Sequence, residues 1–264
     1  MKLQHPLRIF VLVAVFGALA LAASGPAHAT TIWTNWNTAT AGNPGSASGT
    51  LGGMTVTYNG QLGNWDFSNN PSLGWVGGLG SGLWNAFGTS PSTYVGGVVT
   101  DAPTYNAVVM TGPEPTLGFP AVVNETITFS SPVTDPVMAI WSLGAPSVPA
   151  VFIFTGLSNP LILESGGTDE FGGGSIEACT DPTLTVCSAT QYSTGTVAYG
   201  EEGSGTIELP GTYSSISFTT PDSEFYYGFT VGEQTPEPET LSLLGLGLLA
   251  LPLLRASLAR RRRA

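Results

Sequence analysis

Basic side chains are absent from most of this chain. Between Thr30 and Leu254 there is no lysine, arginine or histidine, although all 18 acidic residues fall in that span. Both histidines lie before Thr30, and the seven lysines and arginines stand near the two ends, at Lys2, Arg8, Arg255, Arg260, Arg261, Arg262 and Arg263. We interpret the cationic ends as targeting signals and the acidic middle as the folded domain.

This absence removes most catalytic machinery from the middle of the chain. Serine and cysteine nucleophiles need an imidazole to accept their proton, and the usual zinc sites need histidine or more cysteines. Without Lys or Arg there is no Schiff base and no phosphate clamp. A pair of carboxylates, as in glycoside hydrolysis, is the remaining enzyme chemistry, but no local spacing marks such a pair. We predict that the chain is not an enzyme.

The charge balance also limits the binding partners. A domain without cations releases no counterions from nucleic acid and repels its phosphates, so we expect no nucleic acid partner. The same negative field repels acidic polysaccharides unless calcium bridges them. Neutral glycans or self-association suit the Ser- and Thr-rich strands better.

The composition favours an all-β fold. Only 9% of residues are charged, while there are 35 glycines and 20 prolines. Long helical patterns are missing, and short β-branched or aromatic runs recur between Gly, Pro, Asn and Ser clusters. Residues 30–234 are therefore predicted to form one antiparallel β-sandwich, jelly-roll-like, between a cleaved N-terminal signal and a single C-terminal hydrophobic helix.

Several strands can be placed from their patterns. Residues 225–231 alternate, with Phe225, Tyr227, Phe229 and Val231 on one face, and residues 125–129 alternate in the same way. Residues 137–141 and 151–154 are nearly continuously apolar, which is typical of central strands covered on both faces.

Two further segments carry weaker signals. Residues 205–209 and 214–218 flank Pro210-Gly211, a pair suited to a type II turn, so we expect a hairpin-like end to the domain. The Gly-, Asn- and Trp-rich segment 33–87 contains a short strand at 54–58. It is either a mobile flank or the first strands of the sandwich, and we favour one domain.

The N-terminal 29 residues have the layout of a secretory signal peptide. A short basic region is followed by an apolar run over residues 9–23 and by Ala27-His28-Ala29, a small-x-small cleavage pattern. The run is shorter than the roughly 20 residues that span a membrane, so cleavage after Ala29 is favoured over an uncleaved anchor.

The C-terminal residues 235–264 contain three unlike features in order. These are a spacer with Pro236, Glu237 and Pro238, a Leu-rich segment over 241–254, and a basic stop at Arg255 and Arg260–Arg263. Positive charge stays on the cytoplasmic side, so the preceding domain faces outward. This tail resembles the PEP-CTERM sorting signal of Gram-negative bacteria. An ordinary tail anchor is the alternative.

The resemblance covers about 30 residues and implies a route, not an activity of the domain. In that family a membrane-embedded exosortase cleaves near the Pro-Glu-Pro triplet, and members are commonly linked to exopolysaccharide and biofilm. It implies signal peptidase and exosortase as processing partners, transient anchoring in the inner membrane, and a final place at the cell surface or in the extracellular matrix. Thr235 replaces a common Val, and Pro252 with Arg255 shortens the apolar run.

Three sets of residues are candidate sites in the domain. Cys179 and Cys187 suit a local disulfide in an exported chain, and a metal or nucleophilic pair lacks further ligands or a base. Asp169 and Glu170, in a Gly-rich turn, are a weak calcium site or a solvated acidic turn; no other cofactor is expected. Finally, Trp65, Trp75 and Trp84 stand in loops, where they could stack on sugar rings or cover a core edge.

Together these observations predict an exported surface or matrix protein, structural or adhesive within an extracellular polysaccharide. A calcium-dependent glycan-binding module is the alternative, and a carboxylate-pair glycoside hydrolase is a less favoured one.

Trypsin should leave residues 30–254 uncut even in the unfolded chain, because that span offers no Lys or Arg. Mass spectrometry of a tryptic digest in urea checks this. A tryptic fragment that begins or ends inside the span would contradict it.

Overall fold

The computed structural model describes residues 29–63, 78–84, 91–113, 122, 124–168, 173–222 and 224–235. The described chain forms strands and the short 3-10 helix η2 (Pro91–Tyr94). The strands are β1 (Thr31–Trp33), β2 (Asn35–Thr40), β3 (Gly42–Leu51), β4 (Met54–Leu62), β5 (Leu79–Gly80), β6 (Ala107–Thr111), β7 (Asn124–Thr134), β8 (Val137–Leu143), β9 (Ala150–Thr155), β10 (Leu161–Gly167), β11 (Glu177–Cys179), β12 (Cys187–Ser188), β13 (Thr194–Gly195), β14 (Val197–Gly200), β15 (Gly203–Glu208), β16 (Thr212–Thr219) and β17 (Phe225–Gln234).

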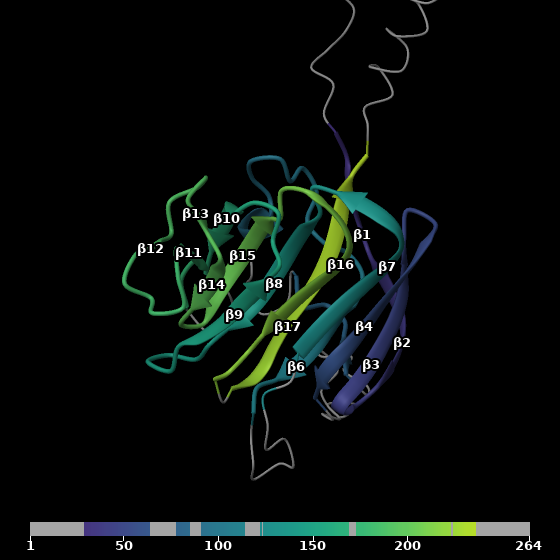
Figure 1. Ribbon diagram of the computed structural model, residues 1–264, viewed down its shortest axis with the longest axis horizontal. Coiled ribbons are helices and arrows are strands. Elements are labelled where there is room, and N and C mark those ends of the chain that lie inside the picture. Colours follow the sequence, from purple (N-terminus) through teal and green to yellow (C-terminus); the bar gives the residue numbers. More distant parts are fainter. Residues whose placement is uncertain are drawn as a thin grey trace, which may run out of the picture. The chain divides into compact units, whose positions relative to one another are not determined.

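These strands make two antiparallel sheets. An eight-stranded sheet has the order β13-β10-β15-β8-β17-β6-β5, with β1 beside β17, and a nine-stranded sheet has the order β12-β11-β14-β9-β16-β7-β4-β3-β2 (Figure 1). The prediction of an all-β, antiparallel fold is confirmed. Segment 33–87, for which a mobile flank was the alternative, supplies β2 to β5, and these strands belong to the two sheets.

The chain alternates between the sheets. Strands β6 to β9 and strands β14 to β17 are each placed in turn in one sheet and then in the other. The predicted hairpin around Pro210-Gly211 is therefore wrong, because β15 and β16 belong to different sheets. The connection is a corner at Gly211, whose N–H donates to Asp135 Oδ1 at 2.7 Å and whose carbonyl accepts the Asp135 N–H at 2.7 Å.

Aromatic rings from both sheets meet at Phe229 of β17. Its ring centroid lies 5.3 Å from that of Tyr58, 6.4 Å from Trp36 and 5.8 Å from Phe218, all three in the other sheet. The predicted inward face of this strand is confirmed for Tyr227, Phe229 and Val231, which are fully buried. A bulge at Tyr226 breaks the alternation before them.

The eight-stranded sheet is also covered on its outer face. All seven residues of β8 are buried, as predicted for a strand covered on both sides. A second apolar cluster explains this, since it packs Leu83, Trp84, Tyr94 and Val99 against Trp141 and its outward-facing neighbours. Trp141 is a core residue, as the sequence predicted.

The first and last strands of the domain pair with each other, so the two ends of the domain lie side by side. Thr31 pairs with Gln234 between β1 and β17, and the Thr235 N–H donates to the Thr30 carbonyl at 2.9 Å (Figure 1). Residues 30–235 make up one compact unit by their contacts. In the described part of the chain, no helix has the length and hydropathy needed to cross a membrane. The predicted C-terminal helix falls outside the described residues.

A carboxyl group is buried between the sheets. Glu125 of β7 has no exposed surface, and its Oε2 accepts hydrogen bonds from the Tyr58 hydroxyl and, at 2.9 Å, from the Gln61 N–H. Its Oε1 has no hydrogen-bond partner among the described residues. Burial raises the pKa of Glu125 from 4.5 to about 7, although the bonds from Tyr58 and Gln61 oppose the rise.

The domain should be more stable at pH 5 than at pH 8. A carboxyl whose pKa is higher in the folded state contributes fully below the unfolded value of 4.5, and its contribution is lost as the pH rises to about 7. For Glu125 this corresponds to about 3 kcal/mol. Glu125→Gln should remove that part of the loss, as measured by urea unfolding at both pH values.

Asp181→Asn is the matched control. Asp181 is exposed, and hydrogen bonds from Thr183 lower its pKa, so this change should not flatten the pH dependence. Equal wild-type stability at pH 5 and pH 8 would show that the buried carboxyls do not control stability.

Candidate functional site

Most of the predicted site residues lie outside the described residues, and Trp84, Cys179 and Cys187 lie within them. Trp65 and Trp75, the calcium turn Asp169 and Glu170, and the sorting residues Pro236, Glu237, Pro238, Arg255 and Arg260–Arg263 lie outside the described residues. Trp84 is described, but it is only 3% exposed, and its indole N–H donates to the Tyr105 carbonyl at 2.8 Å. The suggestion that Trp84 stacks on a sugar is therefore corrected, because its ring packs edge-on against Tyr94.

The two cysteines form the expected disulfide. Cys179 of β11 and Cys187 of β12 are direct partners in the ladder and are bonded to each other. The bond closes a short loop whose turn is held by Asp181, which accepts the Thr183 N–H at 2.8 Å. Cys179 packs with Val151 and Val197 on the outer face of β9 and β14.

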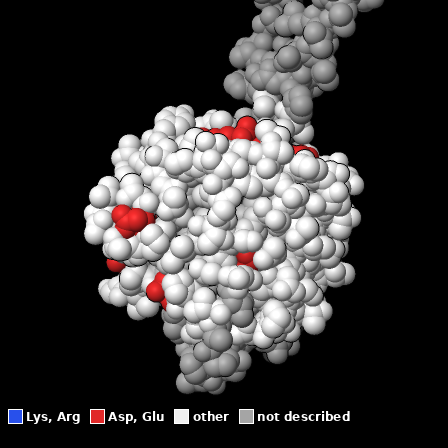
Figure 2. All heavy atoms as spheres, in the orientation of Figure 1, with Lys and Arg blue, Asp and Glu red and all other residues white. Residues whose placement is uncertain are grey.

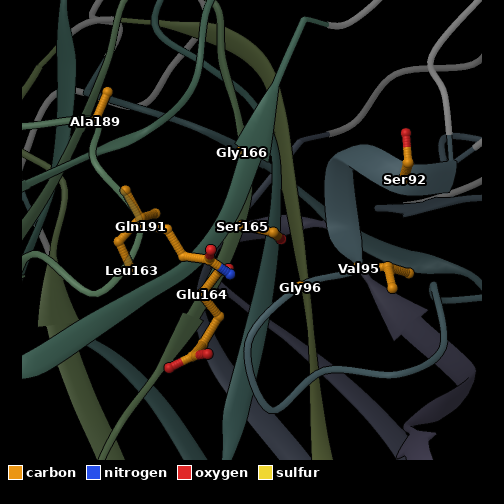
Figure 3. A pocket seen from close by; sticks show the side chains of 9 residues that line it. All are labelled: Ser92, Val95, Gly96, Leu163, Glu164, Ser165, Gly166, Ala189 and Gln191. Atoms are coloured by element: carbon orange, nitrogen blue, oxygen red, sulfur yellow. The ribbon is translucent and has the colours of Figure 1, made fainter.

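A bulge in β10 lies beside a polar hollow. Leu163 pairs with Ile207 of β15, and Ser165 pairs with Thr206. Glu164 has no partner in β15 and is therefore the extra residue of the strand. Leu163, Glu164 and Ser165 are consequently all buried in sequence, instead of alternating. They line a hollow of about 230 Å³ together with Ser92, Val95, Gly96, Gly166, Ala189 and Gln191 (Figure 3).

The carboxyl of Glu164 lies outside this hollow. Figure 3 shows it directed away from Ser165 and Ser92. Its Oε2 accepts the Val98 N–H at 2.9 Å, and the carboxyl also shares a hydrogen bond with Glu208 of β15. Burial, followed by the nearby Glu164 charge, raises the pKa of Glu208 to about 7, and burial raises the pKa of Glu164.

This carboxyl pair does not have the geometry of a glycosidase site. Carboxyls that cleave a glycosidic bond stand about 5 Å or more apart, so that a sugar carbon fits between them. Glu164 and Glu208 are hydrogen-bonded to each other, which leaves no room for a substrate. The pair instead ties β10 and β15 to the turn at Val98.

The wall of the hollow opposite β10 is held in place by backbone hydrogen bonds. Gly96 and Val99 exchange two N–H to carbonyl bonds of 3.0 and 2.9 Å, which closes the turn. Glycine is required at 96, since a Cβ there would lie 2.8 Å from the Glu164 carbonyl and 3.1 Å from Ser165 Cβ. On the third side, Gln191 Nε2 donates to the Glu164 carbonyl at 2.7 Å.

A separate groove lies beside β1. It has a volume of about 410 Å³ and is lined by Thr31, Ile32, Trp33, Asn35, Thr50, Gly52, Asp101, Ala102, Thr104 and Tyr105. Tyr105 is 47% exposed, whereas Trp33 is buried and donates its indole N–H to the Asp101 carbonyl at 2.7 Å. The Asp101 carboxylate already accepts the Thr100 hydroxyl at 2.8 Å.

The outer face of the nine-stranded sheet is a lattice of hydroxyl and amide side chains. The ladder register places them in two rows that cross neighbouring strands, and none of them is charged. We call this surface the hydroxyl face; its rows are Thr38, Ser48, Thr57, Thr128, Ser215 and Thr40, Ser46, Asn59, Thr126, Ser217, Thr155. Figure 2 shows the acidic residues as a few separate patches on a surface otherwise without charge.

No metal cluster and no relative identifies a function. In the described ranges, no three His, Cys, Asp or Glu side chains gather closely enough to hold a metal ion. Comparison of the chain with protein-family models, curated proteins and solved structures found no match.

Sequence reasoning noted the Ser- and Thr-rich strands but not the face that they form together, and it missed the hollow. The alternating Thr and Ser of residues 55–59, 126–130 and 215–219 were a visible signal for the face, because alternate residues of a strand share one side. The hollow depends on a bulge and on residues from three distant segments. These segments come together only through the pairing of the strands in the folded chain.

Replacing both Cys179 and Cys187 by Ala should lower the free energy of unfolding by about 2.5 kcal/mol, the loop-closure value for a loop this short. Urea unfolding of the oxidised chain, with the reduced wild type for comparison, measures the loss. If the double variant kept the wild-type midpoint, the bond would contribute nothing to stability.

Proposed function

We propose that this chain is an exported surface or matrix protein that is structural or adhesive in a neutral extracellular polysaccharide. The N-terminal signal and the PEP-CTERM-like tail support export, processing by signal peptidase and exosortase, and transient anchoring through the C-terminal segment. The disulfide fits an oxidising compartment, where such bonds persist. Binding, not catalysis, is the role of the domain.

The single observation that carries this proposal is the hydroxyl face. Hydroxyl and amide groups both donate and accept hydrogen bonds, so regular rows of them match a polymer whose surface is also made of hydroxyls. Neighbouring strands are spaced by about 4.8 Å, and side chains on one face repeat at about 6.8 Å along a strand. Many weak contacts of this kind add up when a polymer lies across several strands.

The strand order supports a jelly-roll arrangement. The orders β15-β8-β17-β6 and β14-β9-β16-β7, together with the alternation of the chain between the sheets, are those of an eight-stranded jelly roll with β10 as an insertion. Lectin domains are among the proteins built this way, although the fold alone does not specify a ligand.

Charge decides between classes of polymer. The described domain has acidic groups and no basic ones, so a polyanion is repelled and a neutral polymer is not. Calcium-bridged binding of an acidic glycan is the competing function. It requires the Asp169–Glu170 turn, and it predicts that a chelator releases the protein.

Retention on insoluble polysaccharides tests the proposal. The full chain, purified in detergent, should be retained on cellulose and cross-linked dextran but not on alginate, with and without a calcium chelator. Thr57→Val with Thr128→Val removes two adjacent hydroxyls at nearly constant volume and should reduce retention several-fold.

Thr134→Val with Thr212→Val is the control, because these exposed partners lie in the same sheet beyond the two rows and hydrogen-bond to each other at 3.1 Å. No retention on any neutral polymer would refute the proposal. Retention only on alginate, and only with calcium, would favour the competing function.

A further inference from the structure

We propose that the hollow beside β10 binds one pyranose unit of an uncharged saccharide. This assignment rests on the proposed function, and it names a site and a ligand class for it. The site consists of Ser165, Gln191 and the turn at Gly96.

The hydroxyl of Ser165 points to a ligand. Ser165 is 8% exposed, and its Oγ has no hydrogen-bond partner among the described residues. An unpaired buried hydroxyl destabilises the fold, so such a group is unusual unless something else satisfies it. Figure 3 shows this hydroxyl on the side of the hollow that faces Ser92 and Gly96.

Gln191 supplies a second polar group in a defined orientation. The bond from its Nε2 to the Glu164 carbonyl fixes the amide in the lining of the hollow, next to Gly96. Because the side chain is exposed, a ligand hydroxyl can reach its amide oxygen. Ser165 and Gln191 thus offer both a donor and acceptors, as adjacent hydroxyls of a sugar require.

The backbone next to Gln191 has a fixed conformation. Tyr192 is left-handed, with φ of 68°, which is rare for a bulky residue. Its ring is 62% exposed and stands beside Gly97, outside the hollow. Hydrogen bonds join Tyr192 N to the Leu163 carbonyl at 2.7 Å and Leu163 N to the Ser193 carbonyl at 2.8 Å, and these maintain the conformation.

The size and charge of the hollow select the ligand. A volume of about 230 Å³ corresponds to roughly eight water molecules at about 30 Å³ each, enough for one sugar ring but not for a folded peptide segment. Its lining contains no cation, and the Glu164–Glu208 pair lies behind it. An anionic sugar would meet repulsion there, whereas a neutral one would not.

Saturation-transfer NMR and titration on the full chain test the site, with methyl glucoside, methyl galactoside and methyl mannoside as neutral probes and glucuronate as the anionic one. At least one neutral probe should bind at millimolar concentration, and glucuronate should bind about tenfold more weakly or not at all. Ser165→Ala and Gln191→Ala should each weaken binding about tenfold. Tyr105→Ala, which removes an exposed side chain in the separate groove, should not.

Thermal unfolding separates a binding role from a structural one. If the Ser165 hydroxyl serves a ligand, Ser165→Ala removes an unsatisfied group and should keep or raise Tm while binding falls. A lower Tm in Ser165→Ala would assign the hydroxyl to the fold and overturn the site. Loss of binding in Tyr105→Ala alone would overturn it too, and would move the site to the groove beside β1.

Failure of this site is distinguishable from failure of the proposed function. Retention of both Ser165→Ala and Gln191→Ala on cellulose and dextran at the wild-type level, with no binding of any neutral probe, would overturn the site while polymer adhesion stands. Binding of a neutral probe without retention on any polymer would leave the site and refute adhesion.

Discussion

The absence of any cation between Thr30 and Leu254 is the constraint on which the rest of the domain depends. No carboxylate in that span can pair with a basic side chain of the same span, so each buried acid described in it has a neutral donor, a shared proton or its own proton. Glu125 has the Tyr58 hydroxyl and the Gln61 N–H, while Glu164 has the Val98 N–H and Glu208. Burial without a cation raises a carboxyl pKa. Each of these sites therefore contributes more to stability at low pH than at high pH.

Stability must then come from packing. The two sheets meet through aromatic and aliphatic side chains, with Phe229 in contact with rings from three strands of the opposite sheet. Because strands adjacent in sequence alternate between the sheets, most contacts join distant parts of the chain, and the core forms only when both sheets are nearly complete. The disulfide acts locally, at the β11–β12 end, where strands are short and the apolar cluster is small.

Periodicity in the sequence was enough to predict the strand content and several individual strands. Continuous apolar runs identified β8 and β9, and the inward face of β17 followed from alternation after Tyr226. The corner at Pro210-Gly211 shows the limit: a turn dipeptide between two strands is compatible with a hairpin or with a crossing between sheets, and local sequence does not distinguish them. Trp84 shows another, since a tryptophan in a Gly-rich segment can cover a sheet face that sequence alone does not place.

The candidate surfaces differ in how far local sequence could indicate them, and this difference has a physical basis. The hydroxyl face follows from strand periodicity alone, so its residues alternate visibly along each strand. The hollow depends on one inserted residue, Glu164, whose extra position in β10 directs its carboxyl away from the hollow and places Ser165 beside Gly96, where a side chain would collide with the strand. The bond from the Val98 N–H to Glu164 holds the turn against the strand. The Glu164–Glu208 pair and the hollow are therefore parts of one arrangement, in which the pair fixes the turn and the unpaired Ser165 hydroxyl lies between the turn and the strand.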